Sequence, residues 1–174
     1  MTDRDLLGIA TTAKIGSHPL HPMLVPFPIV LLIATFACDL AYWQTARPFW
    51  AEAAFWSLGA AIVMAALAAV AGFTDFLGNA AVRDLRDAWY HMIGNVTAVV
   101  LALISFWIRY QYGVEQGARP WGLVLSTIIV ILLVYTGWKG GDLVYRHRIG
   151  MHPEAPAEGG ASLTGSRSTG VHTS

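Results

Sequence analysis

Two histidine–proline pairs open the first long apolar segment, in the stretch SHPLHPMLVPFPIV at residues 17–30. His18 and His21 each precede a proline, which biases the residue before it toward an extended conformation. In a polyproline helix, which has about three residues per turn, side chains three positions apart point to the same side. The spacing therefore predicts two imidazoles that face one site at the start of an apolar helix.

Two further histidines stand at the ends of later apolar segments. His91 begins the third segment, in WYHMIGN, and His147 follows the fourth, in YRHRIGM. Imidazole nitrogen is a ligand of haem iron and of several transition-metal ions. We therefore take His18, His21, His91 and His147 as candidate ligands of haem b or of a metal ion.

Aspartates stand at matching places near the ends of the second and fourth apolar segments, Asp75 in GFTDF and Asp142 in GGDLVYRH. A ligating histidine usually donates its second ring N–H to a carboxylate or carbonyl, which fixes the tautomer. We expect Asp75 and Asp142 to serve His21 and His91 in this way. Asn95, one helical turn after His91, is a further polar neighbour or a partner for another helix. One histidine and one aspartate in each helix pair also weakly indicate an internal repeat.

The composition identifies the elements that must position these residues. The chain of 174 residues is 55% hydrophobic and only 13% charged, with a mean hydropathy of +0.51. Soluble domains have about 25% charged residues, so this chain is too apolar for that class. Its net charge of zero gives no basic field for nucleic acid. The single cysteine, Cys38, excludes an intrachain disulfide and a thiolate metal cluster.

Four apolar segments are long enough to cross a bilayer as helices, which takes about 20 residues each. The sequence predicts these helices over residues 23–43, 52–73, 89–109 and 121–145. Short connections make neighbouring helices antiparallel, so we expect an all-α integral membrane four-helix up-down-up-down bundle. The transmembrane domain is predicted over residues 17–151, after an N-terminal segment over 1–16. The polar tail over 152–174, which holds His152 and His172, is predicted to be disordered.

This topology places both termini, and the histidines, at one face of the membrane. Eight lysines and arginines fall on that face and three on the other. Because cytoplasmic loops carry the excess of positive charge, the histidine face is predicted to be cytoplasmic, in a bacterial inner membrane.

Charged residues near the opposite face have two interpretations. Asp39 lies near the end of the first helix, Arg47 and Glu52 follow it, and Arg109 ends the third helix. The favoured interpretation is an interfacial ion-pair cluster that locks the first hairpin. A site where cations enter is the alternative.

Four stretches together resemble a known family: HPLHPMLVPFPIVLLIATFACDL, GFTDF, WYHMIGN and GGDLVYRHRIGM. They resemble the bacterial multi-pass membrane proteins of domain of unknown function 2231, over about residues 16–152. The resemblance implies a four-helix membrane domain and, in some relatives, association with a Rieske iron–sulfur domain. This chain has one cysteine and supplies no Rieske cluster of its own. A redox or Rieske-type partner protein is therefore a candidate partner, besides the lipid bilayer.

Three functions follow from these observations. The first is a haem- or metal-binding redox protein of the membrane, with His21 and His91 as axial ligands. The second is a non-catalytic anchor, structural or assembly subunit, in which the histidines bond carbonyls freed by nearby prolines. The third, ranked last, is a transporter or proton conductor, because no helix carries a charge at mid-membrane. No enzyme motif appears, so we predict no catalytic residues; a homo-oligomer stays open.

Overall fold

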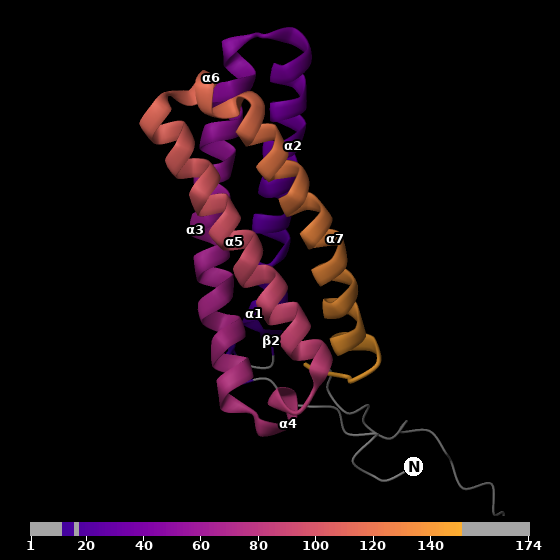
Figure 1. Cartoon of the computed structure of the whole chain (residues 1–174). Helices are drawn as coiled ribbons and strands as arrows, with labels where there is room; N and C mark the ends of the chain where they lie inside the picture. Colours follow the sequence, from indigo (N-terminus) through magenta and orange to yellow (C-terminus); the bar gives the residue numbers. More distant parts are fainter. Residues whose placement is uncertain (1–11, 16–17, 151–174) are drawn as a thin grey trace, which may run out of the picture.

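The computed structural model describes residues 12–15 and 18–150 and is helical almost throughout (Figure 1). The elements follow in this order: β1 (Lys14–Ile15), β2 (His18–Pro19), α1 (Leu20–Leu24), α2 (Pro26–Thr45), α3 (Pro48–Gly78), α4 (Ala80–Arg83), α5 (Arg86–Tyr112), α6 (Val114–Gly117), the π-helical turn η2 (Ala118–Gly122) and α7 (Leu123–Tyr145). Strands β1 and β2 form one short antiparallel pair. The predicted disordered tail lies outside the described residues, as does most of the predicted N-terminal segment.

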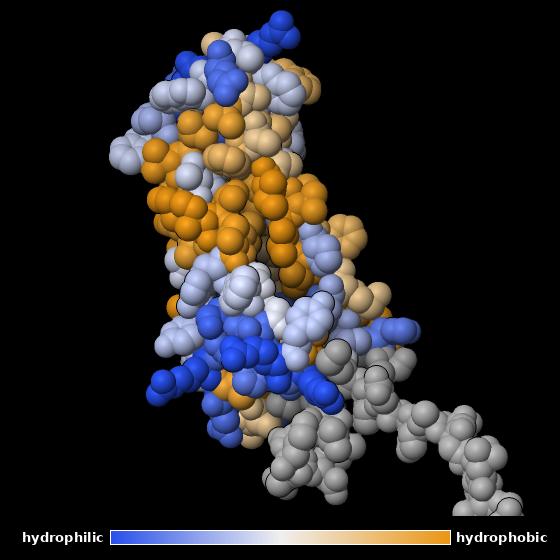
Figure 2. All heavy atoms as spheres, turned by 90° about the vertical axis from the view of Figure 1, so that its right-hand side faces the viewer, coloured by the Kyte–Doolittle hydropathy of each residue, from blue (hydrophilic) through white to orange (hydrophobic). Residues whose placement is uncertain are grey.

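Four helical stretches are long and apolar enough to cross a membrane: Leu20–Thr45, Pro48–Gly78, Arg86–Tyr112 and Val114–Tyr145. The predicted all-α membrane bundle is therefore confirmed. Large apolar side chains cover the outside of these helices; Val63, Ile131 and Val134 are each more than 60% exposed. Figure 2 shows the hydrophobic side chains gathered in the middle of the molecule and the hydrophilic ones toward its ends. This distribution is what contact with lipid requires.

The stretch SHPLHP is only half as extended as we predicted. His18 and Pro19 form strand β2, but helix α1 begins at Leu20 and contains His21. Pro22 is the third residue of this helix, and the first N–H groups of any helix have no partner within it. A proline there removes no hydrogen bond, so the bias of Pro22 toward extended backbone is overridden. The two histidines consequently lie on different kinds of structure.

Consecutive long helices pair into two hairpins, α2 with α3 and α5 with α7. The hairpins meet through α2 against α7 and α3 against α5, and Figure 1 shows the α1 and α4 turns at one end and α6 at the other. The core at the centre consists of Leu32, Leu58, Ala61, Ala98, Ala102, Ile129 and Leu133. Alanines on α3 and α5 let the backbones approach closely, which stabilises packing in lipid.

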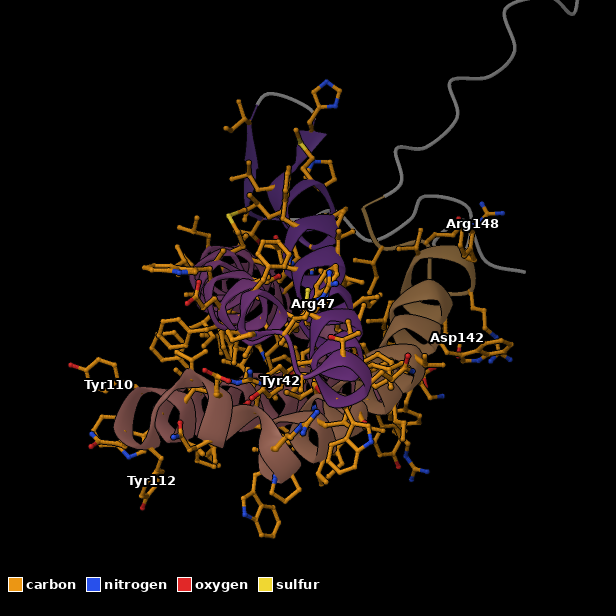
Figure 3. The ribbon with its side chains drawn as sticks, turned by 90° about the horizontal axis from the view of Figure 1, so that it is seen from above. Tyr42, Arg47, Tyr110, Tyr112, Asp142 and Arg148 are labelled. Atoms are coloured by element: carbon orange, nitrogen blue, oxygen red, sulfur yellow. The ribbon has the colours of Figure 1, made fainter. Side chains whose placement is uncertain are left out.

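The connection between α5 and α7 contains more structure than a loop. Gly113 has a φ of 91°, a left-handed value that suits glycine, and it ends α5. The chain then forms α6 and the turn η2, inside which Arg119 has extended dihedral angles. Arg119 donates to the carbonyls of Tyr42 and Trp43, so this connection is fastened to the end of α2. Figure 3 shows Tyr110 and Tyr112, by contrast, directed away from the bundle.

A buried ion pair at this end joins the two hairpins. Arg109 on α5 donates through Nη2 to both carboxylate oxygens of Asp39 on α2, at 2.8 and 2.7 Å, and both side chains are completely buried. Of the four residues in the expected ion-pair cluster, Asp39 and Arg109 form this pair, whereas Arg47 and Glu52 are exposed. The predicted ion pair therefore joins the two hairpins, through Asp39 on α2 and Arg109 on α5, rather than locking the first hairpin.

Candidate ligand site between two histidines

His21 and His91 lie next to each other although 70 residues separate them in the sequence. His21 comes from α1 and His91 from the second turn of α5. Their ring centroids are 6.2 Å apart and the ring planes stand at 86° to one another. Both side chains are half-buried. The fold thus brings together the two histidines that stand at the starts of the first and third membrane helices.

Each imidazole of this pair is tied to a helix carbonyl by the same atom. Nδ1 of His21 lies 2.9 Å from the carbonyl oxygen of Ala68 on α3, and Nδ1 of His91 lies 2.9 Å from that of Thr136 on α7. A carbonyl oxygen can only accept, so each Nδ1 carries the proton and donates. In a neutral ring the proton on Nδ1 leaves the lone pair on Nε2, the state of a histidine that ligates a metal through Nε2.

A glycine one turn later makes each of these carbonyls reachable. Cβ atoms in a helix tilt toward its N-terminus, so the side chain of residue i+4 stands over the carbonyl of residue i. The residues four positions after Ala68 and Thr136 are Gly72 and Gly140. A Cβ on Gly72 would lie 2.8 Å from Nδ1 of His21, and one on Gly140 would lie 3.1 Å from Nδ1 of His91. A side chain at either position would press against the imidazole and require the ring to shift, more so at Gly72 than at Gly140.

Asn95 supports the His91 side of the pair. Its Nδ2 donates to the carbonyl oxygen of His91 at 2.8 Å, and its Oδ1 accepts from the hydroxyl of Thr136 at 3.3 Å. Asn95 thereby links α5 to the residue of α7 whose carbonyl holds His91. Of the two roles predicted for Asn95, the structure therefore shows the hydrogen bond to a neighbouring helix.

The two predicted aspartates bind other groups. One oxygen of Asp75 accepts the backbone N–H groups of Thr12 and Ala13, at 2.6 and 2.7 Å, which fastens the N-terminal strand pair to α3. Asp142 forms ion pairs with Lys139 and Arg146, both at 3.6 Å. The role that we expected of these carboxylates, accepting the ring N–H of a histidine, falls instead to the two helix carbonyls.

The other two candidate histidines lie apart from this pair in their contacts. His18 is exposed on strand β2. His147 faces Asp87, with Nε2 3.2 Å from a carboxylate oxygen, and Lys139 donates to the other oxygen at 2.9 Å. His152 and His172 lie outside the described residues. His21 and His91 therefore lie together, whereas His147 belongs to a charged cluster with Asp87 on α5 and Lys139 on α7.

The number of ligands limits what this site could hold. Within residues 12–15 and 18–150, no group of three or more His, Cys, Asp or Glu side chains is placed to hold a metal ion. Structural zinc takes four protein ligands and catalytic zinc three. Haem iron receives four nitrogens from its macrocycle, so two imidazoles complete its coordination. The described donor set therefore matches haem better than a bare zinc ion.

Four residues of the site escaped prediction: Ala68, Gly72, Thr136 and Gly140. Ala68 and Thr136 act through backbone carbonyls, which every residue type has, so their identity carries no signal. The two glycines do have a recognisable sequence pattern, because each lies near the end of its helix shortly before an aspartate, in AGFTD and GGD. Superposing the two halves of the sequence would have matched Gly72 with Gly140.

A family model described as "Predicted membrane protein (DUF2231)" matches residues 17–153. No curated protein and no solved structure gave a significant match. The matched range contains both histidines, both carbonyl-bearing residues and both glycines of the site.

Proposed function

The chain belongs to the DUF2231 family of predicted membrane proteins, and we propose that it binds haem b between His21 and His91 and serves membrane redox chemistry. The observation that carries the proposal is the imidazole pair itself. Both Nδ1 atoms are committed to helix carbonyls at 2.9 Å, so both Nε2 atoms keep their lone pairs for a ligand. Fixing the tautomer and the orientation of both rings serves a ligand that needs two nitrogen donors.

The spacing of the rings suits one metal centre between them. With metal–nitrogen bonds of about 2.0–2.1 Å, two imidazoles that hold one metal ion have ring centroids no more than about 6 Å apart. The centroids of His21 and His91 are 6.2 Å apart. The two ligands come from different hairpins, so a bound haem would also hold the hairpins together.

The ligand set indicates electron transfer rather than oxygen chemistry. When bound, haem would supply one-electron redox chemistry, and His21 and His91 would hold its iron. Haem iron held by two imidazoles would transfer electrons rather than bind oxygen. The protein contributes the orientation of both rings and a partly buried setting among four helices. The cytoplasmic orientation of this end and the bacterial inner membrane are part of the proposal, supported by the asymmetry of lysines and arginines.

A structural subunit is the second candidate, and the same hydrogen bonds favour it. His21 links α1 to α3 and His91 links α5 to α7, so each imidazole already has a role in holding helices together. The carbonyls that accept these bonds lie in the middle of regular helices, rather than beside the prolines as we expected. In this candidate the protein binds no cofactor and serves a redox or Rieske-type partner as a membrane module.

An optical spectrum separates the two candidates. The protein is expressed with sufficient haem, purified in detergent, and measured as a dithionite-reduced minus oxidised difference spectrum. We expect the bands of a low-spin b-type haem at about one haem per chain, and their loss in His21→Ala and in His91→Ala. His18→Gln is the matched control, because His18 is exposed and lies outside the pair. A flat spectrum, with stability retained in His21→Asn and His91→Asn variants, which keep an N–H donor near the position of Nδ1, would instead support the structural subunit.

A further inference from the structure

The buried positions of the two hairpins repeat at a constant interval. Those of α2 are Pro28, Leu32, Thr35, Asp39 and Tyr42. The positions 70 residues after the first four are buried in α5, namely Ala98, Ala102, Ser105 and Arg109, whereas Tyr112, at the end of α5, is exposed. Those of α3 include Ala54, Leu58, Ala61 and Ala68, and positions 68 residues later are again buried: Gly122, Ser126, Ile129 and Thr136. At these positions the second hairpin buries the same faces as the first, and Arg109 and Gly122 are two positions closer in the sequence than Asp39 and Ala54.

The ligand site repeats with the same intervals. His91 follows His21 by 70 residues, and Gly140 follows Gly72 by 68. The carbonyls that accept the two Nδ1–H groups also differ by 68 positions, and both distances are 2.9 Å. A buried stripe recurs in any amphipathic helix, so it shows little alone. A histidine, a carbonyl and a glycine that recur together in one register are not explained by helical periodicity.

We infer that the chain is a duplicated helical hairpin whose pseudo-twofold axis passes between His21 and His91, and that Gly72 and Gly140 are equivalent positioning residues for the two imidazoles. The inference deepens the proposed function and rests on it for the identity of the ligand. A ligand bound on such an axis would have two equivalent nitrogen donors, one from each histidine. This is the coordination that a metallo-tetrapyrrole accepts.

The opposite end of the bundle supports the same axis. Asp39 and Arg109 occupy equivalent positions, 70 residues apart, and they contact each other across the bundle. Identical charges at this pair of positions would repel, whereas the present pair attracts. The two hairpins therefore carry different residues at the equivalent positions 39 and 109, where like charges would repel, and the same residue at positions 21 and 91.

The test uses alanine at each glycine. Gly72→Ala, Gly140→Ala and the control Gly137→Ala are prepared in the full chain; nothing lies within 4 Å of where a Cβ on Gly137 would stand. Nitrogen NMR of histidine-labelled protein without haem reports which ring nitrogen carries the proton. Gly72→Ala should remove the hydrogen-bonded Nδ1–H signal of His21 alone, and Gly140→Ala that of His91 alone. Gly137→Ala should change neither.

Haem affinity is the second readout. Each positioning variant should lower it about tenfold or more, and by similar factors, as the loss of a residue that orients a metal ligand typically does. Where an alanine variant fails to fold, a second substitution is added and folding is measured again. His21→Ala should restore folding of Gly72→Ala but not of Gly140→Ala. His91→Ala should restore folding of Gly140→Ala but not of Gly72→Ala. Undisturbed Nδ1 signals in both variants, or rescue without this specificity, would overturn the inference. A flat haem spectrum alongside the expected NMR changes would overturn the haem proposal and support the positioning roles.

Discussion

Arg109 and Asp39 form the most deeply buried polar contact that the described residues contain, and its energetics can be tested by substitution. Both side chains have zero exposure, and the hydroxyl of Ser105 accepts a further bond from Arg109 Nε at 3.4 Å. Removing one member of a buried pair leaves an uncompensated charge, which costs about 3–5 kcal/mol. Arg109→Leu should therefore destabilise the protein by about this amount.

Asp39→Leu combined with Arg109→Leu should recover most of that loss, because two apolar residues leave no buried charge. Thermal unfolding in detergent measures both variants, and Arg47→Leu is the control because Arg47 is exposed and the described residues give it no ion pair. A double variant as unstable as Arg109→Leu would contradict this account and assign the pair a role beyond charge compensation.

At the scale of single residues, the sequence predicted that His21 and His91 lie together, and it missed the carbonyls that hold their rings. His21 and His91 could be paired because helix direction places the starts of the first and third helices together. Ala68 and Thr136 could not be found, since the accepting atom belongs to the backbone. Asp39 and Arg109 were recognised as buried charges, but their partnership depends on which helices pack across the bundle. That choice is made by side-chain packing, which no local pattern specifies.

The helices themselves are longer than the sequence predicted. The third and fourth membrane helices were expected to begin at about residues 89 and 121, whereas helical structure begins at Arg86 and Val114. Hydropathy locates the apolar part of a helix. It does not locate the polar residues with which the same helix continues beyond that part. Prolines at the first turns of α2 and α3 mark their starts more sharply than hydropathy does.

A charged cluster fastens the ends of α5 and α7 beside His91. Asp87 on α5 receives bonds from Lys139 and His147, with Lys139 about one-quarter exposed. Ion pairs with this exposure contribute about 0–1 kcal/mol and are screened by salt. Asp87→Asn should consequently lower the midpoint of thermal unfolding only slightly, and the difference from the unsubstituted protein should shrink in 0.5 M salt, roughly the regime of strong screening.

The buried Asp39–Arg109 pair provides the comparison for this cluster. Because it is completely buried, salt should leave the effect of Arg109→Leu nearly unchanged. A salt-insensitive loss of several kcal/mol in Asp87→Asn would show that the cluster is structurally central rather than peripheral.

The whole molecule presents an apolar waist and two polar ends, as Figure 2 shows for one face. The fold class was the most predictable property, because four apolar segments leave few other solutions in lipid. The orientation of the protein in the membrane is predicted from composition alone. Lysine and arginine are in excess at the end that carries His21 and His91, so this end is predicted to face the cytoplasm. The orientation would decide from which side of the membrane a redox partner could approach the two histidines.

Cysteine labelling tests this orientation directly. In a Cys38→Ala background, single cysteines replace Thr45, which is exposed at the Arg47 end, and Asp84, which is exposed in the turn beside α4. A membrane-impermeant maleimide added to intact cells should label the cysteine at position 45 and reach position 84 only after permeabilisation. The physical reason is that arginine-rich ends stay in the cytoplasm during insertion. The reverse pattern would place the histidine pair at the outer face, and labelling of both positions from outside would contradict the alternation of helix directions that brings His21 and His91 together.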